Sequence, residues 1–172
     1  MNVSSGTSAD YYKIDPEAKT IGDVVADKPP LIQDVWRLIF PSDKPIPGSM
    51  STDQPLELID LIMYFDLNAQ EGEIARSCKR FGCDHHSSPR RDLEKIAYYL
   101  RQEYRRVYNL YPYDIPGIQL ESKLSQMVEL ADRCDAAVRF MENRPPAPEV
   151  IGAAVGLVRP EWMNYGGPAF NL

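Results

Sequence analysis

Residues 118–143 read IQLESKLSQMVELADRCDAAVRFMEN, and this stretch carries the strongest periodic pattern in the chain. Its apolar side chains recur at alternating steps of four and three residues, which places them on one stripe of an α-helix. Glu129 with Arg133 and Asp135 with Arg139, acid first and four residues apart, mark the solvated side. We expect a long helix packed inside a helical bundle, with an oligomer seam as the alternative. The apolar stripe consists of Leu120, Leu124, Met127, Ala131, Cys134, Val138 and Met141.

The composition is that of an ordinary globular protein. Of the 172 residues, 44% are hydrophobic and 26% are charged, and a domain of this length can bury a core without a metal ion or disulfide bonds. The net charge is −6, yet the segment 76–106 holds nine Lys and Arg against four acids. An acidic chain with one basic region argues against non-specific nucleic-acid binding.

Cysteine usage and hydropathy bear on the location of the protein in the cell. Three cysteines, two of them on predicted helices, do not suit a disulfide framework. The N-terminal residues lack the basic and apolar regions of a signal peptide, and no apolar run approaches the ~20 residues that span a bilayer. We expect a cytoplasmic protein, or one incorporated in a particle assembled in the cytoplasm, with no membrane partner.

Capping signals divide the first half of the chain into helices. Pro30 suits the first turn of a short helix that is apolar almost all round. Asp53 is the expected N-cap of the next helix. Asn68 with Glu71 resembles a capping box, so a third helix is expected to start there and to end at Gly82.

Two further helices are predicted in the second half. Ser88 and Pro89 open a helix that is expected to pack antiparallel against 118–143, because the connection is short. The segment 149–158, EVIGAAVGLV, suits a helix of about three turns. The chain as a whole therefore predicts an all-α fold, an irregular helical bundle of five or six helices with extended N- and C-terminal arms. The inner face of the helix after Ser88 comprises Leu93, Ile96, Ala97, Leu100, Tyr104 and Val107.

Both ends of the chain lack helical periodicity. We divide the sequence into an irregular N-terminal arm over 1–30, a helical domain over 31–158 and an irregular C-terminal tail over 159–172. The arms hold isolated apolar residues that are costly to leave in water, at roughly 25 cal/mol per Å². They must pack on the domain or on a neighbour, and we expect a protein partner or a second copy of the chain. The expected partner-binding residues are Ile14, Ile21, Val24, Trp162, Tyr165 and Phe170.

The segment 78–86 gathers several side chains that could bind a soft metal ion. Zinc is satisfied by four Cys or His ligands, but two adjacent histidines seldom both reach one ion, and no second pair of ligands lies elsewhere. We expect a polar loop beside buried cysteines, with no metal and no cofactor. The side chains are Cys78, Cys83, Asp84, His85 and His86.

The helices AQEGEIARSCKR and RRDLEKIAYYL, joined by a loop, resemble in outline the helix–loop–helix of all-α nucleotide pyrophosphohydrolases of the MazG-like kind. The resemblance covers about a fifth of the chain. It implies magnesium held by acid pairs three residues apart and hydrolysis of nucleoside triphosphates. Gln70 stands where an acid should precede Glu73, and Lys95 follows Asp92 where a second acid should stand. The acid pair in 129–132 has the right spacing but lies further along the chain.

Basic side chains lie off the apolar face of the helix after Ser88, with Tyr98 beside them. Such a surface suits phosphate groups or an acidic protein. It is equally what the solvated face of any amphipathic helix shows. The residues of this basic face are Arg90, Arg91, Lys95, Arg101, Arg105 and Arg106.

The arms favour a role in protein–protein interaction over catalysis, since a monomeric enzyme has little use for two of them. We expect a non-enzymatic assembly subunit or adaptor, such as part of a phage particle, a secretion machine or an inhibitor of another protein. A metal-dependent nucleoside triphosphate pyrophosphohydrolase is the first alternative. A helical protein that contacts nucleic acid through the basic face is the second.

Overall fold

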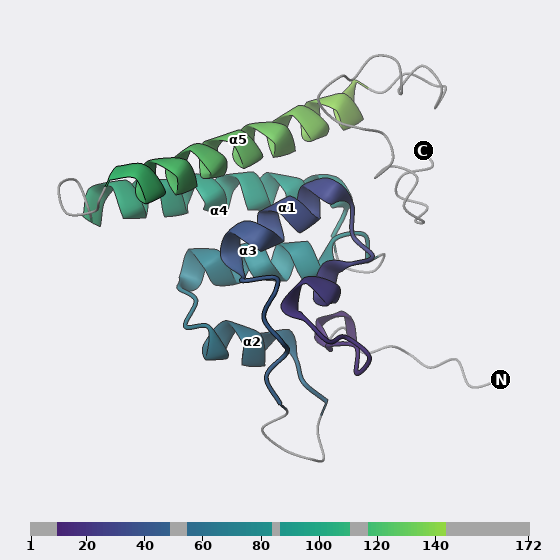
Figure 1. The fold of residues 1–172 in the computed structure, drawn as a ribbon. Coiled ribbons are helices and arrows are strands. Elements are labelled where there is room, and N and C mark those ends of the chain that lie inside the picture. The colour runs from purple at the N-terminus through teal and green to yellow at the C-terminus, as the bar shows by residue number, and fades with distance from the viewer. Residues whose placement is uncertain (1–9, 49–54, 84–86, 111–116, 144–172) are drawn as a thin grey trace.

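The computed structural model describes residues 10–48, 55–83, 87–110 and 117–143 (Figure 1). Within these ranges the chain forms five α-helices and two 3-10 helices, with no β-strand, and the predicted all-α fold is confirmed. The 3-10 helices are η1 (Asp10–Tyr12) and η2 (Ile21–Val25). The α-helices are α1 (Pro30–Ile39), α2 (Leu58–Tyr64), α3 (Ala69–Arg80), α4 (Pro89–Leu110) and α5 (Gly117–Glu142).

Local signals set the ends of α3 and the start of α4 as predicted. Asn68 Oδ1 accepts from the Glu71 backbone N–H at 3.0 Å, and Glu71 Oε2 accepts from the Asn68 N–H at 3.1 Å. This reciprocal pair satisfies two N–H groups that the helix itself cannot bond. Gly82 follows the helix with a φ of 80°, which glycine adopts without strain. Ser88 Oγ accepts from the Arg91 N–H at 3.2 Å at the start of α4.

Helix α2 begins later than its sequence pattern predicts. Ile14 donates its backbone N–H to the Leu56 carbonyl at 2.8 Å, and Lys13 forms an antiparallel bridge with Glu57. This pairing holds the chain extended up to Glu57, where φ is −116° and ψ is 162°, so the helix starts only at Leu58. The predicted cap, Asp53, lies outside the described residues.

Helices α4 and α5 run antiparallel and side by side, and together they lie over α1 and α3 (Figure 1). Arg90 in the first turn of α4 pairs with Glu142 in the last turn of α5, with 2.6 Å between the charged atoms. Their facing apolar stripes are buried, including Leu100 and Ala131, each 0% exposed. The predicted antiparallel pair is confirmed, and it forms the upper layer of the core.

The N-terminal segment packs into the same core. Ile14, Ile21 and Val24 are at most 5% exposed, and the Trp36 Nε1–H of α1 donates to the Ile21 carbonyl at 3.0 Å. Lys28 reaches across to α3, where its Nζ donates to the Phe81 carbonyl at 2.7 Å. These contacts correct the expectation that the three apolar side chains bind a partner: they fill gaps between helices of their own domain.

The C-terminal part of the sequence lies outside the described residues. This holds for the predicted helix over 149–158 and for Trp162, Tyr165 and Phe170 of the expected tail. Among the described helices, none has the length and apolar character needed to cross a bilayer.

Candidate functional site

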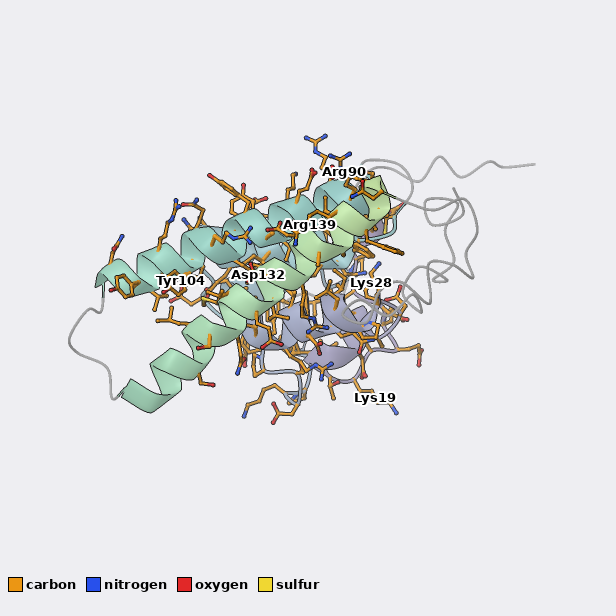
Figure 2. All side chains as sticks on the ribbon, turned by 90° about the horizontal axis from the view of Figure 1, so that it is seen from above. Lys19, Lys28, Arg90, Tyr104, Asp132 and Arg139 are labelled. Carbon is orange, nitrogen blue, oxygen red and sulfur yellow. The ribbon has the colours of Figure 1, made fainter. Side chains whose placement is uncertain are left out.

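A groove of about 890 Å³ opens between the C-terminal part of α4 and the outer side of α5. We call it the α4–α5 groove. In Figure 2, Tyr104 of α4 and Asp132 of α5 lie close together beside it, and Arg139 lies further along α5. The groove is lined by Tyr104, Tyr108, Leu124, Ser125, Val128, Glu129, Asp132, Arg133, Ala136 and Arg139.

The spacing of residues along α5 explains why the groove forms there. The side chains at 125, 128, 132, 136 and 139 recur at steps of three and four, so they make a second stripe beside the buried one. Two of them, Ser125 and Ala136, are small and leave space. On α4, the rings of Tyr104 and Tyr108 stack with centroids 6.0 Å apart and 6° between their planes, and they form one wall.

The groove exposes apolar surface. Val128 is 43% exposed and Tyr108 is 59% exposed, although both lie on helices whose opposite sides are buried. Exposed apolar residues that are scattered singly are normal on any protein surface. A contiguous apolar surface in a concave region more often marks an interaction site. The groove is therefore the candidate functional site among the described residues.

Charged side chains rim the groove, and two of them have no ion-pair partner among the described residues. Glu129 and Arg139 are exposed and enter no ion pair there. The sequence predicted ion pairs of Glu129 with Arg133 and of Arg139 with Asp135, but Arg133 and Asp135 pair with residues of other helices. Arg133 pairs with Asp34 of α1 at 3.0 Å, and Asp135 accepts from Arg101 of α4 at 2.5 Å. Ion pairs between helices therefore take the place of ion pairs within α5, and Glu129 and Arg139 form none among the described residues.

The predicted basic face of α4 is divided. Arg90 and Arg106 bind acids of the chain, at 2.6 Å to Glu142 and 2.6 Å to Glu103. Arg101 contacts Asp132 and Asp135, and its hydrogen bond to Asp135 raises its pKa above the ordinary value. The remaining residues of the face form no ion pair within the described ranges, and they are Arg91, Lys95 and Arg105. Half of the predicted cationic surface is thus used to hold the helices together.

The acids of the helix–loop–helix that resembles a magnesium site also bind arginines. Glu73 pairs with Arg76 at 2.6 Å. Asp92 is 0% exposed, and one of its oxygens accepts from Arg80 at 2.7 Å. No three His, Cys, Asp or Glu side chains of the described residues are grouped so that they could hold a metal ion. Of the two carboxylates that the resemblance singles out, Asp92 therefore links α4 to α3, and Glu73 pairs within α3.

A further buried acid, Glu103 of α4, accepts from Asn68 Nδ2 at 3.1 Å and from Arg106 at 2.6 Å. It joins the cap of α3 to the outer side of α4. Nothing in the sequence distinguishes Glu103, because an acid between basic residues on a helix is typical of an ordinary surface charge.

The cysteines are placed for packing. Cys78 and Cys134 are 0% exposed, and burial raises the pKa of both thiols, that of Cys134 to about 12. Such thiols are poor nucleophiles at neutral pH. Cys83 is half-buried. The other expected members of that loop, Asp84, His85 and His86, lie outside the described residues.

Comparisons of the chain with models of protein families, with curated proteins and with solved structures found no match.

Proposed function

We propose that the protein is a non-enzymatic interaction or assembly subunit that binds a helical segment of a protein partner in the α4–α5 groove. The observation that carries this proposal is an apolar groove whose rim charges Glu129 and Arg139 form no ion pair with any other described residue. An amphipathic helix laid into such a groove is a recurrent mode of recognition. The rim charges Glu129 and Arg139 add selectivity, because charge complementarity steers a partner and fixes its register.

The two alternatives have less support. Magnesium needs several oxygen ligands in a near-octahedral arrangement, whereas Glu73 and Asp92 are each engaged by an arginine. Nucleic-acid binding through the basic face would depend on Arg91, Lys95 and Arg105, since the other three cations of that face bind acids of the chain. A phosphate-binding surface gains affinity with each cation that is free to contact a phosphate.

The experiment starts with affinity capture from the native host, followed by reconstitution of the complex from the purified partner and the purified full chain. Val128→Asp places a charge in the apolar floor and should abolish the stoichiometric complex. Met63→Asp makes the same change at a residue of α2 that is 69% exposed, far along the chain from the groove, and should leave the complex intact.

Two results would overturn the proposal. One is a stoichiometric complex that forms equally well with Val128→Asp. The other is magnesium-dependent release of pyrophosphate from a nucleoside triphosphate that Glu73→Gln abolishes, because this would make the chain an enzyme.

A further inference from the structure

We propose that the segment 149–158 of the same chain docks in the α4–α5 groove, antiparallel to α5, and that a partner binds by displacing it. The regulatory part of this inference rests on the proposed function. The docking itself rests on three properties: the length of chain that follows α5, the apolar pattern of the segment, and the order of its charges.

The length of the chain fits an antiparallel return along α5. Six residues, 143–148, separate the end of α5 at Glu142 from the segment, and connections between packed helices commonly have two to eight. The groove extends along α5 from Leu124 to Arg139, which is roughly 22 Å at 1.5 Å per residue. A ten-residue helix is about 15 Å long by the same measure and fits within it.

The apolar pattern of the segment matches the groove. Ile151, Ala154, Val155 and Val158 follow the spacing i, i+3, i+4 and i+7, which is one face of a helix. The groove is lined by apolar side chains that this face could contact, among them Val128, which is 43% exposed. Docking would remove both apolar surfaces from water, where each is costly at roughly 25 cal/mol per Å².

The order of charges fixes the direction. Glu149 begins the segment and Arg159 follows it, ten residues apart; on α5, Arg139 and Glu129, which form no ion pair among the described residues, are also ten residues apart. In an antiparallel arrangement Glu149 lies beside Arg139, and Arg159 lies beside Glu129 and Asp132. A parallel arrangement would place like charges together. Glu129 and Arg139 therefore gain oppositely charged partners only if the segment runs antiparallel to α5.

The segment is expected to come from the same molecule. A short connection makes docking an intramolecular event, which favours the tethered segment over a second copy in solution. A partner with the same apolar and charged pattern would then have to compete with the tether.

Hydrogen exchange of the isolated full chain, read by mass spectrometry, tests the docking. In the wild type the amides of 149–158 should exchange at least about tenfold more slowly than an unstructured peptide, because a docked helix protects its N–H groups. Arg159→Glu should remove most of this protection by setting like charges beside Glu129. The double variant Glu129→Arg with Arg159→Glu should restore it. Arg91→Glu, the same change at an exposed residue of α4, is the control and should have no effect.

Three outcomes would overturn the inference: unprotected amides in 149–158 of the wild type, no recovery in the double variant, or protection that depends on protein concentration and accompanies a dimer. The last result would assign the segment to a second copy. Failure of the docking is distinguishable from failure of the proposed function, because a partner complex that Val128→Asp abolishes would stand without any protection of 149–158.

Discussion

Helix α5 carries two neighbouring stripes that are covered differently. On the inner stripe, Met127, Ala131 and Cys134 are at most 1% exposed beneath the other helices. The outer stripe lines the α4–α5 groove, where Val128 is 43% exposed. The helix has apolar side chains on both sides, but the described residues cover only one of them. Helix α5 thus supplies the core with one side and leaves apolar surface on its other side open to the groove.

The largest expected difference between the stripes is in thiol reactivity. Cys134 on the inner stripe has a pKa of about 12, whereas a cysteine introduced by Ser125→Cys on the outer stripe should keep an ordinary pKa of about 8.5. The thiolate fraction at pH 8 then differs by roughly a thousandfold. Alkylation followed by mass spectrometry measures the two rates in one sample, and similar rates would show that the inner stripe is open to solvent.

The next difference is in stability. Leu100→Ala removes a side chain that is 0% exposed and packed against the inner stripe, and it should lower the free energy of unfolding by roughly 2–5 kcal/mol, as core truncations do. Val128→Ala on the outer stripe should cost less than about 0.5 kcal/mol, the size of a surface substitution. Denaturant unfolding of the two variants measures both values. A loss below about 0.5 kcal/mol for Leu100→Ala would refute the pairing of α4 with α5.

The smallest expected effect belongs to the ion pair that joins α5 to α1. Arg133 and Asp34 lie 3.0 Å apart with side chains 31% and 35% exposed. A pair this solvated should contribute about 0.2–1 kcal/mol, and salt should weaken it. A double-mutant cycle with Arg133→Ala and Asp34→Ala isolates the coupling. A coupling of more than about 2 kcal/mol would contradict this expectation, because it would require a pair far more buried from solvent than Arg133 and Asp34 are.

Sequence patterns predicted the parts of the fold that depend on local chemistry. Asn68 with Glu71 and Ser88 before α4 are capping signals that act within one helical turn, and the structure has them as expected. The facing stripes of α4 and α5 follow from the 3.6-residue period and a short connection. These features need no knowledge of distant residues.

The features that the sequence did not predict depend on distant contacts. Ile21 is buried in the core, and its carbonyl accepts a hydrogen bond from the Trp36 Nε1–H, fifteen residues away. Helix α2 starts late because residues 13–14 pair with 56–57. The groove requires Tyr104 of α4 to lie beside Val128 of α5, and only the registry of the two helices decides this. Isolated apolar residues in an irregular segment therefore do not reveal, from the sequence alone, whether they pack on their own chain or on a partner.

Calorimetric titration of the purified partner into the full chain tests most directly whether the outer stripe of α5 is a binding surface. Val128→Asp should weaken binding by at least about tenfold, or 1.4 kcal/mol, while Met63→Asp leaves the affinity unchanged. Equal affinities for the wild type and Val128→Asp, with both proteins folded, would contradict the claim.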